Sequence, residues 1–168
     1  MRVYPDFLTA GLMAVLLLGL SACGFHLRGD VKLAPALAKV HIQGGDVYDP
    51  LVRDLVRALS AAGSTVVEEP GAASAVLQVL SNRGDRRVLS VQTTGRVQEY
   101  ELYQTFEFRV RDAAGAELLS AQRLELTRDY LFDADDVLGK AGEEETLRRD
   151  MRRDLVRLVL LRLESLGR

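Results

Sequence analysis

Cys23 is the only cysteine in the chain, and it directly follows a long apolar run, which makes it the first candidate for chemistry. The run extends from Phe7 to Leu20 and ends in the small residues Ser21 and Ala22. A thiolate is a soft nucleophile that forms thioethers, and small neighbouring residues let a peptidase approach the backbone. Because a single cysteine cannot form a disulfide within the chain, stability must come from the core.

The residues before Cys23 have the layout of an export signal. Their apolar run is shorter than the ~20 residues that a bilayer-spanning helix needs. The stretch Leu20-Ser21-Ala22-Cys23 resembles the lipobox of bacterial lipoproteins, whose cysteine is joined to diacylglycerol before the signal is cut and the new amino group is acylated. We therefore predict a cleaved signal at residues 1–22 and a lipidated Cys23, with several acyl chains holding the protein stably on a membrane. Gly24 stands where many inner-membrane lipoproteins have Asp, so this resemblance implies the outer membrane, facing the periplasm.

A second group of residues that could take part in chemistry consists of four basic side chains, Arg86, Arg87, Arg96 and Lys140. Guanidinium groups bind phosphates and carboxylates through two parallel hydrogen bonds. The three arginines flank predicted turns at 82–85 and 94–95, at the ends of adjacent strands, and Lys140 lies in a glycine-flanked loop. The hypothesis is that the four converge on an anionic ligand, and the alternative is that each is a solvated turn charge.

The strands that would position these residues follow from alternating apolar and polar side chains. The clearest strand is 97–111, where Tyr100 and Phe108 belong to an apolar face and Glu101 and Arg109 belong to a charged face. Such alternation is typical of an antiparallel sheet with one covered face. Shorter strands are predicted at 39–43, 65–67, 75–80 and 88–93, and a long strand with a bulge follows the turn at 112–115.

Two amphipathic helices are predicted on either side of the strands. Asp49 and Pro50 form a helix start, and Gly63 ends a helix of about 13 residues. The second helix occupies the C-terminal segment, where Leu147, Met151, Leu155, Leu158, Val159 and Leu166 form an apolar stripe. A one-faced sheet must bury that face, so we predict an α+β two-layer sandwich with both helices on one face of a mainly antiparallel, four-stranded sheet. Residues 23–36 would be a lipidated tether and 37–168 a single domain.

The composition limits the classes of protein to which this chain can belong. Removal of 22 residues leaves 146 of 168, enough for one domain with a core, and 48% hydrophobic with 27% charged residues argues against disorder. The net charge of −2 gives no global field for nucleic acid. Residues 143–168 hold seven arginines but also six acids, which favours pairing along a helix. Nucleic acid is therefore not expected as a partner.

The residues for enzymatic chemistry are sparse, so we predict no catalytic residue and no metal site. His26 and His41 are the only histidines, which makes a histidine-based triad or metal site hard to assemble. No nucleophile elbow, zinc-protease motif or phosphate loop occurs. Asp133, Asp135 and Asp136 lack the spacing of a full calcium loop and are better interpreted as a solvated acidic loop.

The stretch Leu20 to Arg28, which reads LSACGFHLR, resembles the start of the LptE family of lipopolysaccharide-assembly lipoproteins, with its Cys-Gly-aromatic-His-Leu-Arg motif. Residues 95–100 resemble the family's glycine turn before Glu-Tyr and a long strand. Residues 128–133 resemble the aromatic-Asp end of its last strand, and 143–153 the acidic opening of its final helix. The resemblance covers nearly the whole chain after Cys23.

The resemblance implies helices on a four-stranded sheet and a non-enzymatic plug inside the outer-membrane barrel LptD, which inserts lipopolysaccharide into the outer leaflet. No cofactor is implied besides the lipid on Cys23. Arg86, Arg87, Arg96 and Lys140 would then be the lipopolysaccharide patch, and the charged face of strand 97–111 would suit a polar barrel lumen. The alternatives are a generic periplasmic scaffold lipoprotein of another assembly machine and a cell-envelope hydrolase.

Overall fold

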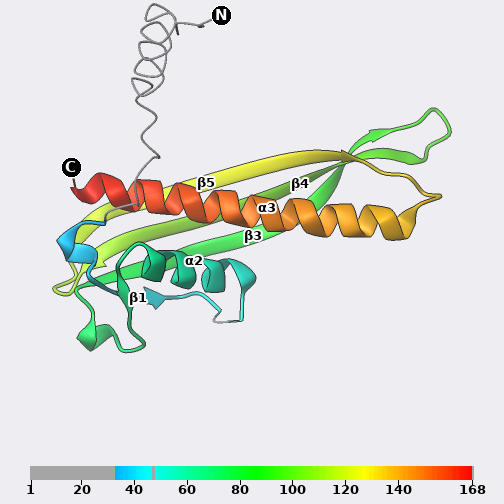
Figure 1. Cartoon of the computed structure of the whole chain (residues 1–168). Coiled ribbons are helices and arrows are strands. Elements are labelled where there is room, and N and C mark those ends of the chain that lie inside the picture. The colour runs from blue at the N-terminus through cyan, green and yellow to red at the C-terminus, as the bar shows by residue number, and fades with distance from the viewer. Residues whose placement is uncertain (1–32, 47, 168) are drawn as a thin grey trace, which may run out of the picture. The chain divides into compact units, whose positions relative to one another are not determined.

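The computed structural model describes residues 33–46 and 48–167, so the predicted signal peptide, Cys23 and most of the tether lie outside the described residues. One sheet has the strand order β2-β1-β3-β4-β5, and helices α2 and α3 cover one of its faces (Figure 1). The strands are β1 (Lys39–Gln43), β2 (Thr65–Val66), β3 (Ala75–Val91), β4 (Val97–Asp112) and β5 (Glu117–Leu131). The helices are α2 (Pro50–Ala61) and α3 (Val137–Glu164), with short 3-10 turns η1 (Pro35–Leu37), η2 (Pro70–Ala72) and η3 (Ser165–Gly167).

The α+β class and the two helices on one sheet face are confirmed, but the prediction of a mainly antiparallel, four-stranded sheet is wrong. The sheet has five strands and is mixed, because β1 pairs in parallel with both β2 and β3. The connection from β1 to β2 passes through α2, and such a helical crossover returns the chain in its original direction. The β3–β4 and β4–β5 pairs are antiparallel hairpins, as the turns predicted.

The turn predicted at residues 82–85 does not form, and the two short strands around it are one continuous strand, β3. A register shift between Val79 and Ser81 marks a bulge, after which β3 keeps its pairing with β4. Asn82 uses its side chain across the sheet instead of turning the backbone: Gln104 donates to it at 2.7 Å. The amide end of the Gln104 side chain also lies in the space that a Cβ at Gly84 would take.

Helix α2 begins and ends where the sequence predicts. The carboxylate of Asp49 accepts a hydrogen bond from the Leu51 amide at 2.7 Å, and Gly63 has a φ of +89° just after the helix. Asp49 also accepts a hydrogen bond from the Asn82 side chain at 2.7 Å. The helix start is therefore tied to the middle of β3 as well as to its own backbone.

We expect Asp49→Ala to lower the free energy of unfolding by about 1–2 kcal/mol, because the change removes both the helix cap and the partner of Asn82. Urea unfolding of the variant measures this loss. Asp46→Ala is the matched control, because Asp46 accepts a backbone hydrogen bond in the loop before α2 without capping the helix. Equal losses in the two variants would contradict this role of Asp49.

Helix α3 starts earlier than predicted, at Val137 instead of near Glu143. Asp136 caps it by accepting a hydrogen bond from the Gly139 amide at 3.1 Å. The prediction that Lys140 lies in a loop is therefore wrong, and Lys140 belongs to the first turn of α3. Glycine is a weak helix former, so the two glycines that flank Lys140 lower the stability of this part of the helix. The Asp136 cap offsets part of that loss.

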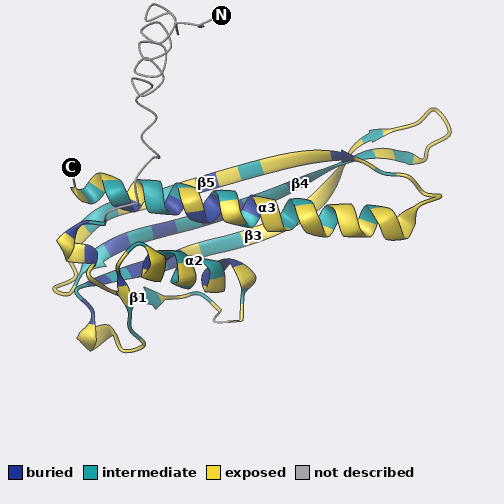
Figure 2. Cartoon of the chain, viewed as in Figure 1, coloured by how far each residue is buried: buried dark blue, intermediate teal, exposed yellow. Residues whose placement is uncertain are grey.

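The core lies between the helices and the covered sheet face, as the buried residues in Figure 2 show. Phe106 and Phe108 of β4 are fully buried and stack at 5.7 Å between ring centroids. A smaller cluster of Leu102, Tyr130 and Met151 continues the core toward the start of α3. Beyond it the side chains become exposed, so one end of the sheet extends past the main core.

Candidate functional site

The end of the sheet where α3 begins brings together segments that are distant in sequence, and we call it the distal end. It comprises the β3–β4 turn and its flanks (88–98), the last residue of β5 with the segment that follows it (131–136), and the first turn of α3 (137–140). The β3–β4 hairpin projects there beyond β5 (Figure 1). Gly95, with a φ of +79°, supplies the left-handed residue of the turn, as the sequence predicts.

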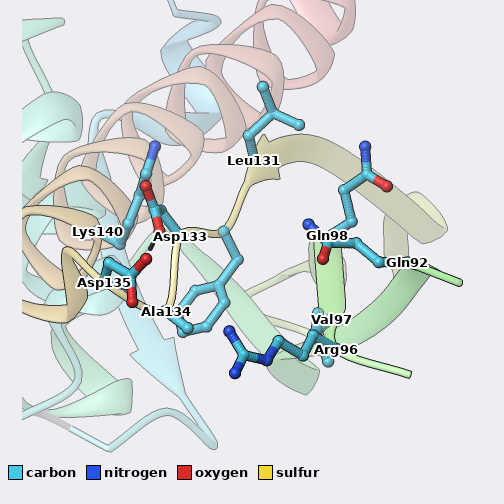
Figure 3. A pocket seen from close by; sticks show the side chains of 10 residues that line it. Gln92, Arg96, Val97, Gln98, Leu131, Asp133, Ala134, Asp135 and Lys140 are labelled. Atoms are coloured by element: carbon cyan, nitrogen blue, oxygen red, sulfur yellow. Dashed lines mark hydrogen bonds between the residues drawn. The ribbon is translucent and has the colours of Figure 1, made fainter. Parts of the chain in front are cut away.

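Arg96 and Lys140 line one open hollow of about 490 Å³ at the distal end. Figure 3 shows that they reach it from different elements, Arg96 from the β3–β4 turn and Lys140 from α3. The other lining residues are Gln92, Val97, Gln98, Leu131, Phe132, Asp133, Ala134 and Asp135. The fold therefore brings together two of the four basic residues that the sequence singled out.

The two cations that line the hollow differ in whether a carboxylate already pairs with them. Lys140 donates a hydrogen bond to Glu143 at 2.8 Å, and this bond raises the pKa of Lys140, which stays cationic at neutral pH. No carboxylate of the described residues lies within ion-pair distance of Arg96. Asp133 also lines the hollow, and it is engaged by the Asp135 amide at 2.9 Å. Arg96 is thus the cation most available to an incoming anion.

Arg86 does not join this hollow, which corrects the hypothesis of four converging cations. Its guanidinium donates to Glu144 at 2.8 Å and to the Tyr130 hydroxyl at 3.4 Å, and it lies 4.6 Å from the centre of the Tyr100 ring. Tyr100 stacks on Tyr130 with centroids 5.8 Å apart. The side chain of Arg86 therefore links β3 to α3 and stabilises the packing of this helix on the sheet next to the distal end.

Glu144 is the centre of this cluster. Its carboxylate accepts hydrogen bonds from Tyr130 at 2.7 Å, from Arg148 at 2.8 Å and from Arg86. Burial alone would raise the pKa of Glu144, but the hydrogen bonds from Tyr130 and Arg148 outweigh it, so the pKa lies below its ordinary value. Burial, followed by the hydrogen bond to Glu144, raises the pKa of Tyr130 and keeps its hydroxyl protonated as a donor.

Arg87 lies on the opposite, uncovered face of the sheet, because successive residues of a strand point to opposite faces. It forms an ion pair with Glu101, and its guanidinium lies 5.9 Å from the centre of the Tyr103 ring. Farther along this face Arg123 pairs with Glu107 at 2.9 Å and Glu125 at 3.3 Å. Arg87 lies opposite Glu101 in the β3–β4 ladder, several residues before the turn that holds Arg96, so the two arginines do not converge.

Exposed apolar side chains occur in the segments of the distal end, Leu131 among the lining of the hollow itself, and the sequence alone assigns them no function. Leu138 is 89% exposed, which is exceptional for a leucine in a helix. Further exposed apolar residues of the distal end are Val88, Leu89, Val91, Leu131 and Val137. The run Val88-Leu89-Ser90-Val91, which breaks the strict alternation of a half-buried strand, was the available signal.

Two further findings concern the described part of the chain. None of its helices combines the length and the apolar character needed to cross a membrane. Within residues 33–46 and 48–167, no three His, Cys, Asp or Glu side chains are grouped so that they could hold a metal ion.

Comparison with known proteins agrees with this architecture. A solution NMR structure of an uncharacterized lipoprotein B from Nitrosomonas europaea is 36% identical, with a TM-score of 0.69 over 82% of this chain and 88% of that one. The crystal structure of the rare lipoprotein B from Shewanella oneidensis is 30% identical, with a TM-score of 0.65 over 76% of this chain and 94% of that one. The described fold is therefore shared with other bacterial lipoproteins.

Sequence relatives carry a more specific description. The LPS-assembly lipoprotein LptE of Photorhabdus laumondii is 28% identical over 153 residues, which cover 88% of this chain and 83% of that protein. The LPS-assembly lipoprotein LptE of Yersinia enterocolitica is 29% identical over 157 residues, 88% of this chain and 75% of that protein. The family model described as LptE, Lipopolysaccharide-assembly, matches residues 37–163. This chain belongs to the LptE family of lipopolysaccharide-assembly lipoproteins.

Proposed function

We propose that this lipoprotein is anchored in the outer membrane by acyl chains on Cys23, occupies the lumen of an LptD-like barrel, and helps to insert lipopolysaccharide into the outer leaflet. The lipid is the only added group, residues 23–36 act as the tether, and residues 37–168 form the working domain. The observation that carries the proposal is the distal end, where Arg96 and Lys140 line one hollow with the exposed side chain of Leu131, and where the same segments carry further exposed apolar residues.

The chemistry of the distal end suits a phosphorylated glycolipid. Lipopolysaccharide has phosphate and carboxylate groups that a guanidinium or an ammonium group binds, and acyl chains that leave water for apolar surface. Among the described residues no carboxylate forms an ion pair with Arg96, and Leu131 lines the same hollow. A purely charged surface would bind the phosphates but offer nothing to the acyl chains.

The uncovered sheet face suits the polar interior of a large barrel. Its charges include cross-strand ion pairs, as in Arg87 with Glu101 and Arg123 with Glu107. Paired charges leave a polar surface with little net field, which can pack against polar lumen side chains without an unpaired charge being buried. A scaffold lipoprotein of another machine would share this face, so the identity of the partner decides between the two functions.

Co-purification tests the barrel partner. The full-length chain, extracted with detergent from outer membranes, should elute as a one-to-one complex with a large β-barrel protein. Replacing Arg123 by Glu puts three acidic groups together on the uncovered face and should reduce recovery of the complex by at least about tenfold, because Glu107 and Glu125 would be buried at the interface without their cationic partner. Lys39→Glu, remote from this ladder, is the control. Recovery as a monomer, or with a different assembly, would contradict the plug.

A further inference from the structure

A second cationic site lies between the two helices, far from the distal end. Helices α2 and α3 pack on the same sheet face, and a groove of about 320 Å³ opens between them. Five of the residues that line it are arginines, and the full set is Pro50, Arg53, Asp54, Arg57, Arg149, Arg152 and Arg153. Such a density of guanidinium groups is unusual in a chain whose net charge is −2.

The nearby carboxylates do not neutralise the five arginines. Three carboxylates pair with four of them: Asp54 with Arg57 and with Arg152 at 3.9 Å, Glu145 with Arg149 at 3.5 Å, and Asp150 with Arg153 at 2.8 Å. Five positive against three negative charges leave an excess of two. This excess equals the charge of a fully ionised phosphate monoester, which carries about −1.5 to −2 at neutral pH.

Two of the arginines have unused hydrogen-bonding capacity. The Nε of Arg152 is buried and donates to no acceptor in the described part of the chain, although Asp54 lies 3.9 Å away. Arg53 is exposed, and no carboxylate of the described residues lies within ion-pair distance of it. The two side chains come from opposite walls, Arg53 from α2 and Arg152 from α3. Both side chains line the groove, so an anion there can contact the solvent-accessible part of each, whereas the buried Nε of Arg152 is closed to it.

We propose that the groove between α2 and α3 binds phosphate groups, with Arg53 and Arg152 as the two principal ligands. Guanidinium forks match the oxygen spacing of phosphate and bind it bidentately. The volume lies at the small end of ligand pockets, enough for a phosphorylated sugar. Apart from Pro50 every lining side chain is charged, so the groove takes a headgroup and excludes acyl chains.

The source of the phosphate is the saccharide part of lipopolysaccharide, and this assignment rests on the proposed function. The groove and the distal end would then hold different parts of one ligand class, the groove a phosphorylated sugar and the distal end phosphate beside acyl chains. Free inorganic phosphate presents the same chemistry to the arginines. The two sources differ in whether an intact saccharide strengthens binding beyond that of the anion alone.

The test is calorimetric titration of the detergent-solubilised, full-length chain with inorganic pyrophosphate, with lipopolysaccharide and with dephosphorylated lipopolysaccharide. Arg53→Gln is the principal variant, because Arg53 forms no ion pair with any residue that the structure describes, and Arg152→Gln is the second. Arg157→Gln on α3 is the matched control, because it makes the same charge change at an exposed arginine outside the groove. Thermal unfolding of each variant establishes that it is folded.

We expect Arg53→Gln and Arg152→Gln each to weaken pyrophosphate binding about tenfold, with no change in Arg157→Gln. The same variants should bind lipopolysaccharide more weakly than the wild type, while their binding of dephosphorylated lipopolysaccharide should be unchanged. If only pyrophosphate binding is weakened, free phosphate is the source, and the saccharide assignment is overturned. Absence of pyrophosphate binding, or equal loss in Arg157→Gln, would overturn the site.

If pyrophosphate does not bind but Arg53→Gln lowers the recovery of the barrel partner, the groove holds an acidic protein segment instead of a phosphate. Loss of lipopolysaccharide binding on mutation of the distal end alone would leave the proposed function intact while removing the groove.

Discussion

Reversing both cations of the distal hollow, in the double variant Arg96→Glu/Lys140→Glu, should weaken lipopolysaccharide binding by about 100-fold. Each charged contact to phosphate contributes roughly tenfold, and the two side chains line the same hollow. The new glutamates would also stand beside Asp133 and Asp135, so the hollow would repel an anionic ligand. Titration of lipopolysaccharide into the purified full-length chain measures the loss.

The matched control is Lys39→Glu/Arg162→Glu, which makes the same change in net charge at the start of β1 and in the last turn of α3, outside the hollow. It should keep nearly the affinity of the wild type, because surface charges farther apart than about 8–10 Å are screened at physiological salt. Equal weakening in both double variants would mean that the effect is one of net charge. Unchanged affinity in the first would remove Arg96 and Lys140 from the binding site.

Glu144→Ala should lower the free energy of unfolding at neutral pH by about 2–3 kcal/mol, the largest loss we expect from a single polar residue here. The change leaves Arg86, the Tyr130 hydroxyl and Arg148 without their shared acceptor. Glu145→Ala is the control on the adjacent position, since Glu145 is 75% exposed and its pairing with Arg149 at 3.5 Å is worth little. Urea unfolding should show almost no loss in the control.

The stabilisation by Glu144 depends on pH in a defined direction. The pKa of its carboxyl is lower in the folded protein than its ordinary value of 4.5, so its contribution is present above that value and is lost as the pH falls through the folded pKa. The difference in stability between wild type and Glu144→Gln should therefore be constant near neutral pH and shrink on acidification below about 4.5. A difference that grows on acidification would contradict the role of the ionised carboxylate.

Local sequence signals predicted the elements whose stabilising contacts are themselves local. The Asp49 cap and Gly63 delimit α2, and the alternation along β4 assigned Phe106 and Phe108 to the covered face. Membership of the LptE family confirms the predicted resemblance, with a non-enzymatic role in lipopolysaccharide assembly. Lipidation of Cys23 remains a prediction.

The predictions that were wrong concern residues whose conformation or partners are set by contacts with residues distant in sequence. Residues 82–85 have turn composition, but pairing with β4 and the contacts of Asn82 with Gln104 and Asp49 keep them extended. Arg86 and Glu144 are 58 residues apart in sequence, so nothing local predicts that this arginine is structural. The same holds for the groove, whose arginines come from two helices separated by the whole β3–β5 meander.

Site-specific photo-cross-linking tests the central claim, that the distal end is where lipopolysaccharide is bound, most directly. A photoreactive residue in place of Gln98, which lines the hollow, should cross-link to lipopolysaccharide in cells, and the yield should fall in the Arg96→Glu/Lys140→Glu background. The same residue in place of Glu69, in the loop before η2 and outside this hollow, should give no such product. Equal cross-linking at the two positions, or none at Gln98, would contradict the account.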